Sequence, residues 1–184
     1  ADGRIRLTMT SGNGQNVWAY LYDTDGTTLI ASGYTSGSAD VVNKDGLGAG
    51  TYYVRVNTYY TSEWAPYTLT DSVYAPTQAN DTEPNNNKTQ ATTLALNGTV
   101  TGHTNYYYNL VKDSSDWYKM TIPQDGMISL TINSHNGQNV WVYLFDKDGT
   151  TQINAVYSSS TGTIKTDALG AGTYYLRINT YYTN

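Results

Sequence analysis

Residues 13–26 read NGQNVWAYLYDTDG, and residues 136–149 read NGQNVWVYLFDKDG. Each copy alternates small or aliphatic side chains with aromatic ones and then reaches an Asp-Gly pair, the pattern of a β-strand that runs into a hairpin turn. Around this stretch, residues 2–30 align with residues 125–153, and 20 of the 29 positions are identical. The offset of 123 residues is long enough for each repeat to be a domain rather than one turn of a solenoid.

A second duplicated block sets the expected domain boundaries. Residues 47–61 correspond to residues 169–183 at an offset of 122, and a Pro- and Asn-rich stretch lies between the copies. We expect residues 1–74 to be the C-terminal part of a first β-sandwich repeat, 75–87 a connector, and 88–184 a second repeat without its last strand. Such a chain is either a fragment of a longer array or a subunit that is completed by strand exchange with a neighbour.

The composition indicates an all-β protein and excludes several functions. The 17 Gly and 19 Tyr residues suit short strands joined by tight turns. Only ten Lys and Arg stand against 15 Asp and Glu, with no basic run, so a nucleic-acid partner is not expected. The sequence contains no stretch of about 18 apolar residues, so membrane insertion is not expected. Cysteine is absent, which excludes disulfides and thiolate sites.

Strand parity divides the duplicated stretches into two faces. Val17, Ala19 and Leu21 share one face, which we expect to line the core of the sandwich. The opposite face is aromatic with polar groups between the rings and is a candidate ligand or interface surface. It comprises Trp18, Tyr20, Tyr22, Tyr53 and Arg55 in the first copy, and Trp141, Tyr143, Phe145, Tyr175 and Arg177 in the second. Such a face can pack under loops, join repeats or chains, or stack on sugar rings or an extended peptide.

Four motifs in the second copy occur in a recognisable order. DTEPNNN at 81–87 is followed by DSSDWY at 113–118, then by the 136–149 hairpin, and finally by GAGTYYLRI at 170–178. This order resembles the bacterial pre-peptidase C-terminal domain, whose relatives include the collagen-binding domains of clostridial collagenases. The resemblance implies a jelly-roll-like antiparallel β-sandwich that serves as a non-catalytic accessory module of secreted or cell-surface bacterial proteins.

The same resemblance implies a calcium site. In collagen-binding relatives an acidic start and an Asp-rich loop together bind calcium (Ca²⁺). Transferred by position, the candidate ligands are Asp81, Glu83, Asn85, Asn86, Asp113 and Asp116. Their side chains offer an oxygen set of the kind that calcium prefers.

The remaining motifs predict no catalysis. Asp23 to Gly26 and Asp146 to Gly149 lack the later ligands of an EF-hand, so we interpret both as hairpin turns. His103 and His135 show no triad spacing. We therefore expect an extracellular binding or spacer module that anchors its parent protein to a polysaccharide or a fibrous protein. The alternative is a structural subunit of a filament or surface layer, whose partners are further copies of itself.

Overall fold

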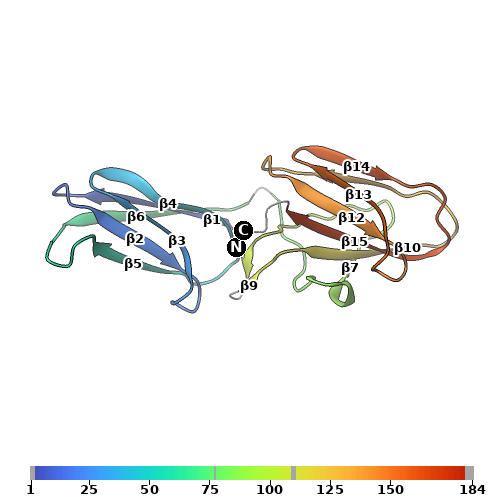
Figure 1. The fold of residues 1–184 in the computed structure, drawn as a ribbon, viewed down its shortest axis with the longest axis horizontal. Coiled ribbons are helices and arrows are strands. Elements are labelled where there is room, and N and C mark those ends of the chain that lie inside the picture. The colour runs from blue at the N-terminus through green and yellow to red at the C-terminus, as the bar shows by residue number, and fades with distance from the viewer. Residues whose placement is uncertain (1–2, 77, 109–110, 181–184) are drawn as a thin grey trace. The chain divides into compact units, whose positions relative to one another are not determined.

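The computed structural model describes residues 3–76, 78–108 and 111–180, and its regular structure is almost entirely β-strand (Figure 1). The chain divides into two compact units: Ala1–Pro76 with Tyr106–Lys112, and Thr77–Asn105 with Asp113–Asn184. Each unit packs one sheet on another around its own apolar core, so the expected all-β sandwich class is confirmed. Within the described ranges, no helix has the length and apolar character needed to cross a membrane.

The first unit has two sheets, in the strand orders β6-β1-β4-β8-β9 and β3-β2-β5. All their pairings are antiparallel except that of β4 with β8. The strands are β1 (Gly3–Ser11), β2 (Val17–Tyr22), β3 (Leu29–Thr35), β4 (Ser38–Leu47), β5 (Tyr53–Thr58), β6 (Tyr67–Tyr74), β8 (Tyr107–Tyr108) and β9 (Val111–Lys112).

The second unit has sheets in the orders β13-β12-β15-β10-β7 and β11-β14. Among the described strands of this unit, only the pairing of β10 with β7 is parallel. Its elements are the 3-10 turn η1 (Lys88–Gln90) and the strands β7 (Thr92–Thr93), β10 (Asp116–Ile122), β11 (Ser129–Asn133), β12 (Val140–Phe145), β13 (Gln152–Ser158), β14 (Thr161–Lys165) and β15 (Gly172–Thr180).

The duplicated stretches fold alike. β2 pairs with β3 and β12 with β13, and both hairpins have a register shift at the last residue of the first strand. Gly26 and Gly149 take left-handed φ angles of 67° and 65°, which glycine adopts without strain. The interpretation of both Asp-Gly stretches as hairpin turns is confirmed.

Parity sorts the β2 side chains as expected. Val17, Ala19 and Leu21 are fully buried and pack on Leu7 and Met9 of the facing sheet. In the second unit Val142 and Leu144 take the corresponding core positions. The core of each unit therefore lies between its two sheets, and the aromatic row is on the outer side.

One short segment lies outside the continuous stretches that the sequence suggests. Residues 106–112 follow the expected connector by about 20 residues, yet they belong to the first unit. Tyr107 pairs with Leu47 at the edge of β4, its carbonyl accepts the N–H of Gly48 at 2.7 Å, and its ring lies under Lys44. The edge of β4 therefore pairs with the β8-β9 hairpin, whose residues follow the first copy in the sequence. Most of the expected connector, from residue 78 onward, lies in the second unit.

Candidate metal centre and aromatic faces

Two segments of the second unit meet at its acidic cluster, which we define as Asp81, Glu83, Asp113 and Asp116. Asp81 and Glu83 come from the loop before η1, and Asp113 precedes β10. Asp116 is the first residue of β10 and has the same core-facing parity as Tyr118. The start of a core strand therefore directs a carboxylate inward, under the 81–85 loop.

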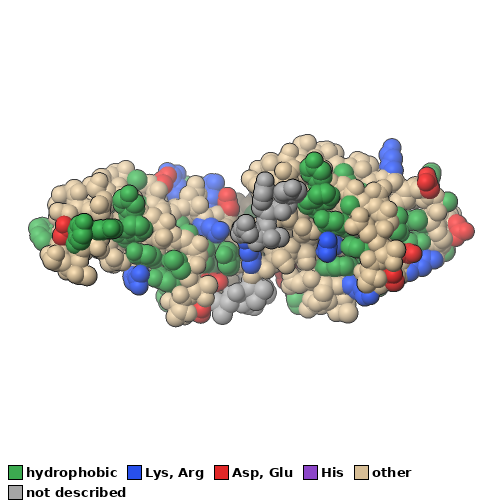
Figure 2. All heavy atoms as spheres, in the orientation of Figure 1, with side chains coloured by type: hydrophobic (Ala, Val, Ile, Leu, Met, Phe, Trp, Pro, Cys, Tyr) green, Lys and Arg blue, Asp and Glu red, His purple; other side chains and the backbone are tan. Residues whose placement is uncertain are grey.

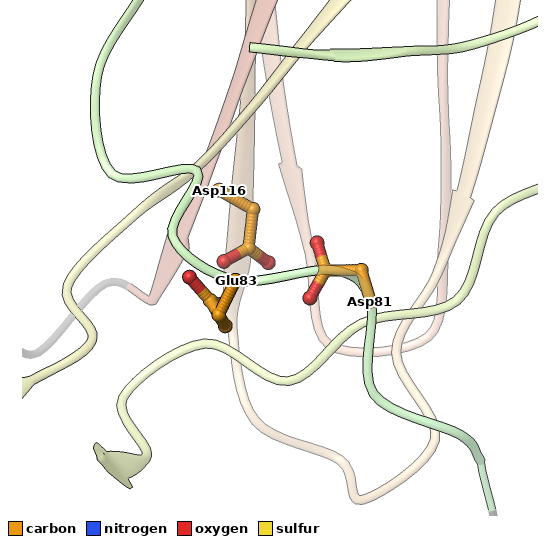
Figure 3. Close-up of side chains that lie close together, drawn as sticks. All are labelled: Asp81, Glu83 and Asp116. Carbon is orange, nitrogen blue, oxygen red and sulfur yellow. The ribbon is translucent and has the colours of Figure 1, made fainter. Parts of the chain in front are cut away.

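Three of the carboxylates converge. Asp81, Glu83 and Asp116 each offer an oxygen, and these oxygens all lie within 4.8 Å of one another. Figure 3 shows the three side chains turned toward a shared space. Two oxygens that ligate one calcium ion at 2.3–2.6 Å cannot be more than about 5 Å apart, so this spacing fits a single ion.

Hydrogen bonds hold the two segments together. The side-chain amide of Asn85 donates to Asp81 Oδ2 at 2.5 Å, and its backbone N–H donates to Glu83 Oε2 at 3.0 Å. The Tyr118 hydroxyl also donates to Asp81 Oδ2. The Trp117 N–H donates to the carbonyl of Asn85 at 2.8 Å, which ties the loop to β10. The arrangement fixes one oxygen of several of these groups and leaves the other free.

Five side-chain oxygens of the cluster and of Asn85 are buried and accept no hydrogen bond. They are Asp81 Oδ1, Glu83 Oε1, Asn85 Oδ1, Asp113 Oδ2 and Asp116 Oδ1. The ion pairs of the described residues, Arg4 with Asp45 and Arg6 with Asp40, both lie in the first unit. Buried polar atoms normally have a partner, and buried carboxylates are costly without a compensating charge. Five unpartnered acceptors in one place therefore call for a cation or for protons.

The electrostatics of the cluster reflect this shortage of positive charge. Burial raises the pKa of Glu83 to about 7, with a further contribution from the charge of Asp113. Burial raises the pKa of Asp116 to about 10, helped by the charges of Asp81 and Asp113. The pKa of Asp113 is raised, and that of Tyr118 is raised too, in both cases first by burial. A cation among these groups would reverse the effect, since it favours their charged forms.

The donor atoms fit a hard cation. All five free atoms are carboxylate or amide oxygens, the ligand type that calcium, magnesium and manganese prefer, and zinc sites are built mainly from nitrogen and sulfur. The cluster could therefore hold a metal ion.

The predicted ligands do not all reach the cluster equally. Asn85 is fully buried and its amide oxygen is among the free acceptors. Asn86 is exposed, and its backbone carbonyl accepts the Ser115 hydroxyl at 3.4 Å. Its side chain has no contact that brings it to the carboxylates in the described structure.

Two residues of the site were not predicted. Tyr118 donates to Asp81, and its core-facing parity with Asp116 was the available signal. Gly102 lies so close that a Cβ there would stand 3.0 Å from Asp81 Cγ and from the Tyr118 hydroxyl. No local motif identifies Gly102, because the contact joins residues far apart in sequence.

The outer face of β3-β2-β5 carries a row of rings. Trp18 stacks on Tyr20 at 5.8 Å and on Tyr34, its partner across the hairpin, at 4.7 Å between ring centroids. Arg55 lies over Tyr20 at 4.5 Å and over Tyr22 at 5.5 Å. Tyr53 pairs with Tyr22 and is half exposed. Figure 2 shows hydrophobic side chains with Lys or Arg side chains among them on the visible face of each unit.

The second unit repeats this row on β12 and β15. Trp141 stacks on Tyr143 at 5.4 Å and packs on Tyr157 at 4.8 Å, and Arg177 lies over Tyr143 at 4.4 Å. Tyr175 pairs with Phe145 across the strands. Phe145 is only 7% exposed, because Trp117 of β10 stacks on it at 5.4 Å. Phe145 is therefore buried beside the exposed rings of the row and offers almost no surface to a ligand. Tyr34 and Tyr157 were missed, although the hairpin register places each beside a predicted Trp.

Comparison with known families agrees with the order of the motifs. Residues 114–180 match the bacterial pre-peptidase C-terminal domain. The resemblance drawn from the motifs is confirmed for this part of the second unit. A pre-peptidase C-terminal domain is of an extracellular, non-catalytic type, and the matched range includes Asp116 and the aromatic row of β12 and β15.

Other comparisons add little. Among solved structures, the chain is similar to the crystal structure of PBSX exported protein XepA. The identity is 7%, the match covers 97% of this chain and 76% of that one, and the TM-score is 0.19. A likeness at that level supports no argument about fold or function. No curated protein matches the chain.

Proposed function

We propose that the acidic cluster binds one calcium ion and that the second unit is a calcium-ordered, non-catalytic module of a secreted or cell-surface bacterial protein. The observation that carries the proposal is the set of five buried, unpartnered oxygens around the convergent carboxylates. Bound calcium would supply the charge that these oxygens lack and would join the 81–85 loop to the start of β10.

Calcium is favoured over magnesium by the number of protein oxygens. Calcium takes six to eight oxygen ligands in flexible geometry, whereas magnesium keeps several waters and uses one or two carboxylates. Four carboxylates and the Asn85 amide are a larger set than magnesium needs. Extracellular modules bind calcium at about 10⁻⁴–10⁻³ M, and we expect an affinity in that range.

Calorimetric titration of calcium into the chelator-treated chain tests the site. We expect one ion per chain and at least tenfold weaker binding in the Glu83→Gln variant. Glu63→Gln is the matched control, since Glu63 belongs to the first unit. If calcium gives neither heat nor a change in melting temperature, or if Glu83→Gln binds like wild type, the proposal is wrong.

We further propose that the aromatic rows bind an extracellular polymer, either a polysaccharide or a fibrous protein. What supports this is the alternation of stacked rings with Arg55 and Arg177, since flat rings and fixed donors suit sugar rings and peptide groups. Tyr34 and Tyr157 are each 56% exposed, so a ligand could reach them.

Pull-down on insoluble collagen, cellulose, chitin and xylan tests the polymer. We expect retention on one of them, reduced about tenfold by joint Tyr34→Ala and Tyr157→Ala substitutions, since exposed aromatics dominate such contacts. Tyr67→Ala is the control, because Tyr67 is equally exposed on β6 of the other sheet. Retention on none of the polymers, or full retention of the double variant, would contradict the proposal.

The second candidate function is a structural subunit of an extracellular filament or surface layer. What supports it is the partly exposed aromatic row of each unit, which could serve as a contact between copies. Sedimentation at increasing concentration, with and without calcium, tests this role. Assembly supports it, and a strictly monomeric chain at the highest concentration removes it.

A further inference from the structure

The sheet faces that carry the aromatic rows have formal charges of one sign. In the second unit, the outer-face positions alternate with the core positions along β13, β12, β15 and β10, and the charged residues among them are Arg177 and Lys119. On the corresponding face of β3-β2-β5 the charged residue is Arg55. The whole chain has 15 acidic and ten basic residues. Among the described strand residues, these faces of an acidic protein therefore carry cations and no carboxylate.

Aromatic rings hold Arg177 in place. Its guanidinium carbon lies 4.4 Å from the ring centroid of Tyr143, 5.6 Å from that of Phe145 and 5.9 Å from that of Trp117. Its Nε is buried and has no hydrogen-bond partner, and neither ion pair of the described residues involves it. The rings fix the guanidinium group without neutralising its charge, so its terminal nitrogens can bind an anionic group of a ligand.

The first unit repeats this arrangement. Arg55 lies opposite Tyr20 across the strands, as Arg177 lies opposite Tyr143, and its guanidinium group lies over both Tyr20 and Tyr22. Arg55 likewise takes part in neither ion pair of the described residues. A cation that is held on the aromatic row is therefore a property of both copies.

The rings of the row stand upright on the sheet. The centroids of Trp18 and Tyr34 are 4.7 Å apart, and their planes differ by 27°. The guanidinium carbon of Arg55, on the other side of β2, lies 4.5 Å from the centroid of Tyr20. Both distances are close to the spacing of neighbouring strands, about 4.8 Å, so the ring faces are turned toward the neighbouring strands. The ring edges, which carry partial positive charge, and the tyrosine hydroxyls therefore point outward, and this surface favours an anionic ligand.

The spacing of the cations selects among anionic polymers. Trp117 pairs with Arg177 and Lys119 pairs with Tyr175, so the two cations are diagonal neighbours whose backbones are about 7–8 Å apart. Duplex nucleic acid carries one charge per about 1.7 Å of its axis, which two cations cannot match. A polysaccharide with a carboxylate on every sugar ring, or on alternate rings, has a much lower charge density. Its hydroxyls also suit the neutral polar groups of the face, such as Tyr175 and Asn179.

From these observations we infer that the polymer bound by the aromatic rows is an acidic polysaccharide. Its uronic-acid carboxylates bind Arg177 and Lys119 in the second unit and Arg55 in the first. The planar guanidinium fork can donate two parallel hydrogen bonds to one carboxylate, and the rings around it keep it in one orientation. This names the ligand class for the polymer-binding role proposed above and rests on that role, but not on the calcium site.

Biolayer interferometry of the full chain on immobilised polymers tests the inference. The probes are hyaluronate, glucuronoxylan and polygalacturonate, each beside its carboxyl-reduced form, which keeps the backbone and loses the charge. Dextran sulfate and polyglutamate are the other anionic probes, and calcium is held at one concentration throughout. We expect the chain to bind at least one uronate polymer at least tenfold more tightly than its reduced form, and more tightly than dextran sulfate or polyglutamate.

Three chain variants complete the test. Joint Arg55→Gln and Arg177→Gln substitutions should weaken uronate binding at least tenfold. Joint Arg4→Gln and Lys165→Gln substitutions are the matched control, because they remove the same charge from the other sheet of each unit and should leave the affinity unchanged. Lys119→Glu changes an exposed side chain, so the variant should fold and should bind about threefold more weakly.

The possible failures are distinguishable. Equal binding to a uronate polymer and its reduced form, tighter binding to dextran sulfate or polyglutamate, or wild-type affinity of the joint Arg55 and Arg177 variant overturns the inference. Retention on cellulose, chitin or collagen without binding to any uronate polymer also overturns it and leaves the polymer-binding role intact. Binding to none of the soluble or insoluble polymers contradicts both.

Discussion

Two kinds of aspartate differ sharply in this chain. Asp25 lies in an exposed hairpin turn, and its two oxygens accept the N–H and hydroxyl groups of both Thr27 and Thr28. These donors hold the pKa of Asp25 well below its usual range. Asp116 is buried beside other carboxylates, and its Oδ1 accepts nothing. Acidic spacing by itself therefore does not mark a metal site; unsatisfied buried oxygens do.

The same contrast exists within the second unit. Asp148 repeats the role of Asp25, with the Thr150 and Thr151 N–H groups donating to its carboxylate at 2.8 Å. It stands in a DKDG stretch that resembles the start of a calcium loop, but its oxygens accept hydrogen bonds within the hairpin turn. Four measurements test this difference between the two kinds of aspartate.

The largest expected effect is the loss of calcium stabilisation in Asp116→Asn. Calcium at about 100 times its dissociation constant contributes about 2.7 kcal/mol, which raises the melting temperature of a unit this size by about 10 °C or more. The variant should show almost none of this increase. In chelator it should melt close to wild type, because a carboxyl with a pKa of about 10 is already uncharged at neutral pH. Calorimetry that shows the full calcium shift in the variant would remove Asp116 from the site.

Tyr118→Phe should come next. The substitution deletes the hydroxyl that donates to Asp81 and keeps the buried ring. Hydrogen bonds to charged groups contribute about 1.5–3 kcal/mol, so we expect the free energy of unfolding to fall by about that amount. Tyr174→Phe is a useful control, because its hydroxyl donates to the carbonyl of Gly170, away from the acidic cluster. Urea unfolding in which Tyr118→Phe matches wild type would show that this contact adds nothing.

A smaller effect is expected from pH in the presence of chelator. Glu83 has a pKa raised from 4.5 to about 7, and a carboxyl with a raised pKa stabilises the fold only while it is protonated. Its contribution is complete below pH 4.5 and is lost as the pH rises through 7. Because Glu83 is only partly buried, solvent screening reduces the full linkage effect, and we expect the melting temperature of the second unit to fall by about 3–5 °C between pH 5 and pH 8. Glu83→Gln should flatten this dependence, and a melting temperature that rises over the same range would show the opposite sign.

The smallest effect is expected for Asp148→Asn. An amide keeps one acceptor for the turn, so the melting temperature should drop only slightly, with the calcium shift unchanged. Differential scanning calorimetry with and without calcium measures both. If Asp148→Asn removes the calcium shift, the ion binds at the hairpin turn and the comparison between the two kinds of aspartate fails.

Sequence reasoning recovered the local features of this chain. Alternation in residues 17–22 predicted which side chains enter the core, and the Asp-Gly pairs predicted the hairpins, because both depend on neighbours in the chain. The acidic residues were identified through the order of motifs. The family match covers residues 114–180, a range that includes Asp116 but not the other predicted ligands.

Long-range contacts were out of reach. Gly102 lies against Asp81, and Tyr107 pairs with Leu47 of β4, which is 60 residues earlier in the chain. No sequence pattern indicates either contact. The exposure of Phe145 was overestimated, since parity identifies the face of a strand but not what a neighbouring strand such as β10 lays on it.

The position of residues 106–112 has a practical consequence for dissecting the gene. A protein fragment that ends at residue 76 would contain the first unit without β8 and β9, and the N–H of Gly48 would lose its acceptor, the Tyr107 carbonyl. A protein fragment that starts at residue 77 would contain the β8-β9 hairpin without the first-unit sheet with which it pairs. A single cut in the expected connector therefore leaves the first unit incomplete and leaves the second unit with an additional hairpin. Segmental labelling or co-expression of both pieces is therefore a better route to studying each unit than truncation.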